Sequence, residues 1–284
     1  MRSQTTKALA ETPKISLEQA LLNGWLELWY QPKIELRALT DCGAEALIRA
    51  RHPKLGIVLP ANFMPQAGAP ILTPLSKFVM KQATADWKQY FADLTSPLKL
   101  AVNIPLSVIV APGFIDLARS SLPNDWRFPG LIIEAREGEI VEDLELAHEI
   151  ITQLKLYNIS LSVDDFGSAY SSFSRLRELS VVEPKIDGGF VQNCSSDESK
   201  QTLCRCIVDL AHRFEALTCA EGVENPDDLR TLISIGCDMA QGFLFAQPQT
   251  APSLRATLVD QATHQDSPAG AREQPQSSSA MTAR

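Results

Sequence analysis

The sequence is short of histidine, of positive charge and of long apolar runs. It has four histidines in 284 residues, 26 lysines and arginines against 34 aspartates and glutamates, and a formal net charge of -8. Binding to long nucleic acid needs a basic surface that displaces counterions, so this charge argues against such a partner. No stretch reaches the roughly 18 apolar residues of a membrane span, and the first residues lack the apolar segment of a secretion signal. We therefore expect a cytoplasmic protein without a membrane span.

The six cysteines form no Cys-x-x-Cys pair. Cys204 and Cys206 stand two apart in a helical pattern, so their side chains would not share a face. A chain of this length can bury a core without disulfides, and cytoplasmic proteins keep their thiols reduced. We expect buried, reduced cysteines.

One large domain accounts for most of the chain. Residues 1–14 are polar and mixed, and residues 263–284 are low in apolar content and rich in serine, glutamine and proline. Such segments bury too little apolar surface to offset the entropy of ordering them, so we expect both to be disordered. No linker longer than a loop interrupts residues 15–262, which we predict to be a single domain.

Short apolar runs alternate with longer amphipathic stretches throughout that domain. The predicted strands are Leu26–Ile34, Asp41–Ala50, Leu98–Ile104, Leu131–Glu134, Leu161–Asp164, Val181–Ile186, Leu217–Glu221 and Met239–Phe245. The predicted helices are Ser16–Asn23, Leu75–Leu94, Ser107–Ser121, Val141–Tyr157, Ser171–Leu179, Ser196–Phe214, Asp227–Ile235 and Pro252–Ala262. This alternation favours a parallel sheet, and eight strands favour closure into a barrel.

The first connection is an exception to the parallel pattern. Residues 35–40 are too few for a parallel crossover, so the first two strands should form an antiparallel hairpin. The predicted fold is therefore α/β, a TIM-like (β/α)8 barrel with an antiparallel first strand.

Polar side chains stand at or near the ends of the strands, where barrels of this kind carry their chemistry. They are Glu45, Asn103, Glu134, Asp164, Asp165, Lys185, Glu221 and Gln241. Taken alone, Asn103 can satisfy backbone groups at a strand end, and Glu221 can lie at a helix N-terminus. Glu134 can pair with Arg127 or Arg136. Their joint placement within apolar sequence favours one shared site, because buried charge is costly unless it is paired or metal-bound.

Asp164 and Asp165 are adjacent acids between an apolar run and Gly167. Successive strand side chains point to opposite faces, so both acids can reach one site only if the strand ends between them, which Gly167 permits. Two carboxylates held that close repel by about 4 kcal/mol at an effective dielectric of about 20, unless a proton or cation intervenes. The alternative is a solvated loop with surface acids.

The donor atoms of this set predict the kind of cation. Five carboxylates and an amide oxygen, with almost no histidine, favour Mg²⁺ or Mn²⁺ over zinc. That number of acids suits two ions about 3.5–4 Å apart, an arrangement that activates water and holds a phosphodiester.

Eight short motifs occur in order along residues 16–250. They are Tyr30-Gln31-Pro32, Glu45-Ala46-Leu47 with Arg49 and His52-Pro53, Val102-Asn103, Glu134 to Glu137, Asp164-Asp165-Phe166-Gly167, Lys185-Ile186-Asp187, Ala220 to Glu224, and Gln241-Gly242. With these motifs the chain resembles the EAL domain, the bacterial cyclic di-GMP phosphodiesterase family. Asp-Phe-Gly also occurs in protein kinases, but no glycine-rich loop or His-Arg-Asp loop accompanies it here.

The resemblance implies a reaction and its cofactors. Water would attack one phosphodiester of cyclic di-GMP in line and open the ring to linear 5'-pGpG, with two Mg²⁺ or Mn²⁺ ions bound. The implied ligands are Glu45, Asn103, Glu134 and Asp164 for one ion, and Asp164, Asp165 and Glu221 for the other. Lys185 would hold the attacking water, and Glu221 would also serve as a base.

The resemblance also implies binding and supporting roles. Arg49 would contact a phosphate, and the nucleotide pocket would be lined by Gln31, Leu47 and Gln241. Glu137 and Glu224 would brace the loop after Asp165, to which Ser168 belongs. In the family this loop links the site to a dimer interface, so a homodimer is expected.

The chain departs from the family's usual pattern at several positions, none of which is a predicted metal ligand. Ser168-Ala169 replaces Thr-Gly, Ala50 replaces an aromatic residue, and Arg136 replaces a threonine. Alanine lacks the access of glycine to positive φ, which bears on the order of the loop. Because some family members only bind the nucleotide, one alternative is a catalytically silent cyclic di-GMP receptor. Another is an adaptor whose barrel only docks partner proteins.

Overall fold

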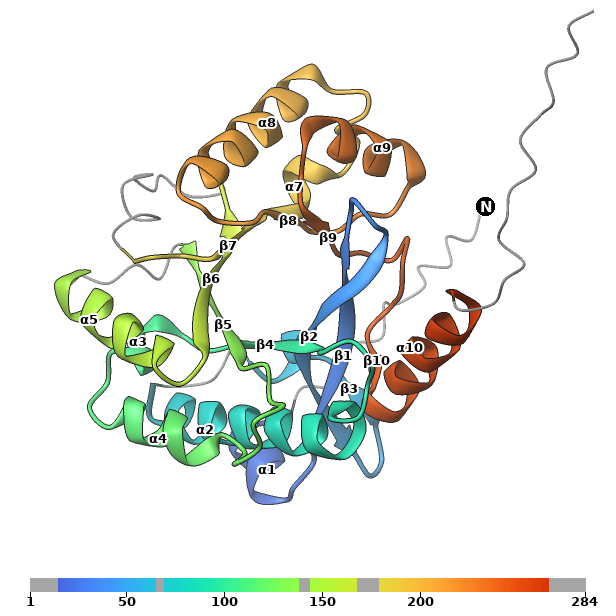
Figure 1. The fold of residues 1–284 in the computed structure, drawn as a ribbon. Coiled ribbons are helices and arrows are strands. Elements are labelled where there is room, and N and C mark those ends of the chain that lie inside the picture. Colours follow the sequence, from blue (N-terminus) through green and yellow to red (C-terminus); the bar gives the residue numbers. More distant parts are fainter. Residues whose placement is uncertain (1–14, 65–68, 138–143, 168–178, 266–284) are drawn as a thin grey trace, which may run out of the picture.

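A closed ring of strands surrounded by helices forms the body of the protein (Figure 1). The computed structural model describes residues 15–64, 69–137, 144–167 and 179–265. Within these residues the ring runs β1, β2, β4, β5, β6, β7, β8, β9 and back to β1. The strands are β1 Leu26–Glu35, β2 Thr40–His52, β4 Lys99–Asn103, β5 Leu131–Arg136, β6 Ile159–Phe166, β7 Glu183–Ile186, β8 Cys219–Ala220 and β9 Met239–Ala240. The predicted barrel is confirmed.

The reversed first strand is also confirmed. β1 pairs antiparallel with β2 from Leu26 opposite Ala50 to Glu35 opposite Thr40, and it pairs antiparallel with β9 on its other side. From β2 through β4 to β9, the neighbouring strands of the ring are parallel. The carboxyl ends of these parallel strands therefore meet at one mouth of the barrel.

Two short strands extend the sheet beyond the ring and were not predicted. β3, Gly56–Val58, pairs antiparallel with β2, and β10, Gln249–Thr250, pairs antiparallel with β1. Each has only two or three residues, too few to leave a hydrophobic pattern in the sequence.

The helices cover the outside of the barrel (Figure 1). They are α1 Leu17–Leu22, α2 Ala69–Asp86, α3 Leu106–Ile109, α4 Phe114–Ser121, α5 Leu144–Lys155, α7 Gly188–Val191, α8 Glu198–Arg213, α9 Pro226–Ile235 and α10 Ala251–Gln265. A 3-10 turn, η1 Pro60–Asn62, precedes α2, and a π-helical turn, η2 Trp87–Phe91, follows it. None of the described helices has both the length and the apolar character needed to cross a bilayer.

Some helix predictions differ from the structure. The single helix predicted at Ser107–Ser121 is divided into α3 and α4, because Gly113 takes a left-handed φ of 84° between them. The C-terminal helix α10 continues to Gln265, past the domain boundary expected at 262. Residues 1–14 and 266–284, expected to be disordered, lie outside the described residues, as does nearly all of the helix expected at 171–179.

Strand periodicity places apolar side chains outside the ring and polar side chains within it. On β5, Ile133 and Ala135 belong to the apolar core, while Glu134 between them makes ion pairs inside the barrel. On β6, Leu161 and Val163 are likewise core residues, and Ser162 between them makes buried polar contacts. The barrel therefore holds a polar interior inside an apolar shell.

Candidate functional site

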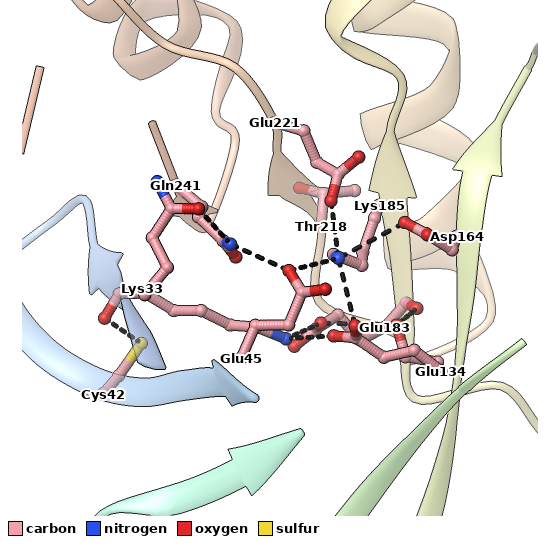
Figure 2. Close-up of polar contacts among 12 residues, drawn as sticks. Lys33, Cys42, Glu45, Glu134, Asp164, Glu183, Lys185, Thr218, Glu221 and Gln241 are labelled. Carbon is pink, nitrogen blue, oxygen red and sulfur yellow. Dashed lines mark hydrogen bonds and ion pairs between the residues drawn. The ribbon is translucent and has the colours of Figure 1, made fainter. Parts of the chain in front are cut away.

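The ammonium group of Lys185 lies at the centre of a cluster of carboxylates (Figure 2). Its Nζ is 3.1 Å from Glu45 Oε2, 3.2 Å from Glu134 Oε2, 3.2 Å from Asp164 Oδ1 and 2.5 Å from Glu221 Oε1. These acids come from β2, β5, β6 and the residue that follows β8. Lys185 itself is completely buried. The structure thus brings together residues that the sequence places at the ends of different strands.

Amide side chains hold Glu45 from two sides. Asn103 Nδ2 donates to Glu45 Oε1 at 2.8 Å, and Gln241 Nε2 donates to Glu45 Oε2 at 2.8 Å. Gln241 Nε2 also donates to Gln31 Oε1 at 3.0 Å, and Gln31 Nε2 donates to the carbonyl of Ala246 at 3.0 Å. Asn103, Gln31 and Gln241 therefore belong to the same network as the acids.

Asp164 and Asp165 both face the mouth of the barrel, but not for the predicted reason. The strand does not end between them: β6 continues to Phe166, and its register with β7 shifts between Val163 and Phe166. Asp165 takes a left-handed φ of 56° within this irregular segment, which breaks the alternation of side chains. One carboxylate oxygen each of Asp164, Asp165 and Glu221 consequently lies within 4.8 Å of the others.

Burial and the neighbouring charges shift the pKa values of these acids in different directions. Burial and the neighbouring Glu45 together raise the pKa of Glu134 to about 7, although Lys185 and Lys33 act in the opposite direction. Burial also raises the pKa of Glu221, and Asp164 adds to this effect although Lys185 lowers it. Burial opposes ionisation of Glu45 as well, but Lys185, Lys33 and the amide donors lower its pKa to about 2.

The interior has more acids than the lysines can neutralise. Five carboxylates surround two ammonium groups: Glu45, Glu134, Asp164, Glu183 and Glu221 with Lys33 and Lys185. Nearer the surface, Asp165 lies 3.9 Å from the exposed guanidinium of Arg136. Full ionisation of these five acids leaves three negative charges beyond the two lysines, which divalent cations would balance. Asp164 Oδ1 is also buried and, among the described residues, makes no hydrogen bond beyond its 3.2 Å ion pair with Lys185 Nζ. These oxygen donors fit hard cations such as Mg²⁺ or Mn²⁺.

Two predicted substrate residues lie on the same strand as Glu45. Leu47 and Arg49 follow it at intervals of two on β2, and both side chains are half-buried. Strand periodicity puts them on the face of Glu45, farther toward the mouth. Arg49 Nη1 donates to the carbonyl of Ile48 at 2.8 Å. Partial burial lowers the pKa of Arg49, while Glu45 raises it.

The predicted loop-bracing residues are only partly described. Glu137 is buried, and its Oε2 accepts from the backbone N–H of Gly167 at 3.1 Å. Glu224 is exposed after β8. Ser168 and the loop that follows lie outside the described residues, so the bracing role of Glu137 and Glu224 stays a prediction.

The prediction missed Lys33 and Glu183, two charged residues inside the barrel. Lys33 Nζ is 2.8 Å from Glu134 Oε1 and 2.5 Å from Glu183 Oε1. Both residues stood within predicted strands. The signal that would have found them is periodicity, since Lys33 stands two residues after Gln31 and Glu183 two residues before Lys185.

Comparisons with known proteins agree with this architecture. Residues 15–248 match the EAL domain family. A cyclic di-GMP phosphodiesterase of Pseudomonas aeruginosa is 33% identical over 246 residues, which cover 86% of this chain and 42% of that protein. The bifunctional diguanylate cyclase/cyclic di-GMP phosphodiesterase MucR of the same organism is 31% identical over 245 residues, covering 86% of this chain and 36% of that protein. The chain thus spans less than half the length of these relatives.

Solved structures share the fold over most of the chain. The PaMucR phosphodiesterase in its c-di-GMP complex gives a TM-score of 0.77 at 31% identity, covering 84% of this chain and 97% of that one. The FimX EAL domain from Pseudomonas aeruginosa bound to c-di-GMP gives a TM-score of 0.71 at 25% identity, covering 82% and 94%. The ordered motifs, the barrel with its reversed first strand and the match over residues 15–248 agree. The chain belongs to the EAL domain family.

Proposed function

We propose that this chain is a phosphodiesterase that hydrolyses cyclic di-GMP to linear 5'-pGpG with two bound Mg²⁺ or Mn²⁺ ions. The observation that carries the proposal is the convergence of Asp164, Asp165 and Glu221, with oxygens within 4.8 Å of one another. The uncompensated negative charge around Lys185 supports the same reading. Two relatives named as cyclic di-GMP phosphodiesterases support the choice of substrate.

The donor groups divide into two sets that share one residue. Glu45, Asn103, Glu134 and Asp164 would hold one ion, and Asp164, Asp165 and Glu221 the other. The side-chain nitrogen of Asn103 donates to Glu45, so the side-chain oxygen of Asn103 is the atom that can bind the cation. When bound, the two ions supply activation of water and compensation of charge on the phosphodiester.

Lys185 and Glu221 differ in what they can do with a proton. Burial lowers the pKa of Lys185, but the surrounding acids raise it by more, so that the net pKa lies well above its ordinary value. Lys185 therefore stays an ammonium and can donate hydrogen bonds to the attacking water or the reacting phosphate. The raised pKa of Glu221 suits a group that accepts the proton of that water.

Residues nearer the mouth would bind the rest of the nucleotide. Arg49 carries a positive charge above Glu45, which suits contact with a phosphate oxygen. Gln31, Leu47 and Gln241 would line the pocket, where Gln241 Oε1 has no hydrogen-bond partner among the described residues. Both amides are already fixed by the hydrogen bond between Gln31 and Gln241.

A hydrolysis assay tests the proposal. Purified protein with Mg²⁺ or Mn²⁺ should convert cyclic di-GMP to 5'-pGpG, which chromatography measures. Either Glu45→Ala or Glu221→Ala should abolish formation of this product. Asp116→Ala is the control, because this acid is exposed on α4, away from the barrel interior. Turnover that survives both active-site changes would contradict the proposed residues.

Calorimetry combined with the hydrolysis assay distinguishes an enzyme from a catalytically silent receptor. Calorimetry with cyclic di-GMP in Ca²⁺ should show binding without turnover. Binding in Ca²⁺ together with no product in Mg²⁺ or Mn²⁺ would identify a silent receptor. No binding in any metal would favour an adaptor.

A further inference from the structure

A second layer of charge lies beneath the proposed metal ligands. Lys33 on β1 and Glu183 on β7 are only 2% and 3% exposed, and their side chains meet at 2.5 Å. Ser162 on β6 joins them: its Oγ donates to the Glu183 carbonyl at 2.7 Å and lies 3.3 Å from Glu183 Oε1. Ser162 thus holds Glu183, and Glu183 in turn holds the ammonium group of Lys33. Figure 2 shows Lys33 and Glu183 beneath the acids around Lys185.

The ammonium group of Lys33 also donates a hydrogen bond to one carboxylate oxygen of Glu134. Lys33 Nζ lies 2.8 Å from Glu134 Oε1. The other oxygen, Oε2, lies 3.2 Å from Lys185 Nζ and 3.5 Å from Asn103 Nδ2. Because the two oxygens have different partners, the carboxylate cannot rotate without breaking a buried ion pair. Glu134 can turn only Oε2 toward the other proposed ligands.

We propose that Lys33, anchored by Glu183, is a positioning residue that fixes Glu134 so that its Oε2 is presented to a divalent cation. This inference rests on the proposed function for its metal site, and it assigns no contact between Lys33 and the substrate. Groups behind a metal ligand commonly set its orientation, and their loss lowers metal affinity or activity by about 10- to 100-fold.

Two single substitutions separate positioning from simple electrostatics. Lys33→Met removes a positive charge near the cation site, so electrostatics alone predicts tighter binding of the cation. Glu183→Gln removes a negative charge, so electrostatics alone predicts weaker binding. Positioning predicts weaker binding in both variants, because each loosens the anchor of Glu134.

The experiment measures Mn²⁺ binding to the nucleotide-free protein by calorimetry, alongside thermal unfolding. We expect the dissociation constant to rise about 10- to 100-fold in Lys33→Met and by a smaller factor in Glu183→Gln. Lys33→Arg should recover part of the loss. With Mn²⁺ at saturation, the KM for cyclic di-GMP should stay within about twofold of wild type, because the positioning role ends once the cation is bound.

A control variant accounts for a loss of stability. Asp228→Asn removes a buried carboxylate that accepts from the backbone N–H groups of Asn193 and Ser195, outside the metal site. It should lower the unfolding temperature without changing Mn²⁺ affinity. Should Lys33→Met fail to fold, Lys33→Arg decides the question: it keeps the positive charge, so electrostatics alone predicts unchanged Mn²⁺ affinity, whereas positioning predicts a partial loss.

The outcomes separate this inference from the proposed function. Unchanged or tighter Mn²⁺ binding in Lys33→Met, or unchanged binding in Glu183→Gln, would overturn the positioning role. A wild-type protein that binds Mn²⁺ but yields no 5'-pGpG would overturn the proposed function instead, while the affinities of the variants still decide the role of Lys33.

Discussion

The Nζ atom of Lys185 lies 2.5 Å from Oε1 of Glu221, and the lysine side chain is completely buried. The same ammonium group contacts Glu45, Glu134 and Asp164. Lys185 is thus the internal counterion of the proposed metal site as well as a proposed catalytic group.

Removal of this ammonium group should make stability depend on divalent cations. Without them, Lys185→Met should lower the free energy of unfolding by about 3–5 kcal/mol, because it leaves buried acids without their partner. Mg²⁺ should restore more stability to this variant than it adds to wild type, although hydrolysis stays lost. Urea denaturation with EDTA or Mg²⁺ measures both effects. An equal response of the two proteins to Mg²⁺ would contradict the counterion role.

The backbone of Asp165 leads to a second prediction. Its left-handed φ of 56° suits aspartate and asparagine but is strained for a β-branched residue. Asp165→Asn should therefore weaken Mn²⁺ binding with little loss of stability, whereas Asp165→Val should also lower the free energy of unfolding by about 1–2 kcal/mol.

A matched variant separates strain from loss of the carboxylate. Glu215 is exposed and has a φ of 59° away from the acidic cluster. Glu215→Val should lose stability like Asp165→Val while Mn²⁺ affinity, measured by calorimetry, stays unchanged. Full metal affinity in Asp165→Asn would remove Asp165 from the proposed ligands.

The barrel and most of the site were predictable because each strand carries its own signal. A residue such as Glu134 at the end of an apolar run marks both the strand and the mouth of the barrel. Lys33 was missed because a single polar residue inside a strand is equally compatible with solvent exposure. Its burial follows from Glu183, which lies 150 positions farther along the chain. Pairing over that distance is set by closure of the barrel and leaves no local pattern.

The ends of the last strands also depend on long-range packing. The apolar run predicted at Met239–Phe245 forms a strand only as far as Ala240. Beyond it, Gly242 approaches Val223 so closely that an added Cβ would lie 2.1 Å from the Val223 carbonyl oxygen. Hydrophobicity in the sequence carries no information about this approach.

Gly242→Ala should therefore disturb both stability and substrate binding. The clash with Val223 should lower the free energy of unfolding by about 1–3 kcal/mol. It should also displace the adjacent Gln241, whose side chain donates to Glu45, and so raise the KM for cyclic di-GMP. Gly188→Ala is the control, because its added Cβ would meet no atom closer than 3.6 Å. Wild-type stability and KM in Gly242→Ala would show that the backbone around Gly242 and Val223 can move apart without loss of stability or substrate binding.

Asp228 should contribute stability that is lost in acid. Burial raises the pKa of its carboxyl group, but the N–H groups of Ser195 and Asn193 and the Asn225 side chain lower it by more, so the net pKa is below its usual value. A depressed pKa in the folded state gives stability that is complete above the unfolded value of about 3.9 and disappears as pH falls through the folded pKa.

Asp228→Asn tests this dependence directly. At neutral pH the substitution should lower the free energy of unfolding by about 1–3 kcal/mol, because the donors lose a charged acceptor. The difference from wild type should shrink as the pH falls below about 4, where the wild-type carboxylate becomes protonated. Urea denaturation across this range measures it, with Asp227→Asn as the control, since Asp227 is an exposed neighbour on α9. A difference that stays constant down to the lowest pH would show that the effect comes from packing, because only an ionised carboxylate gives the dependence on protons.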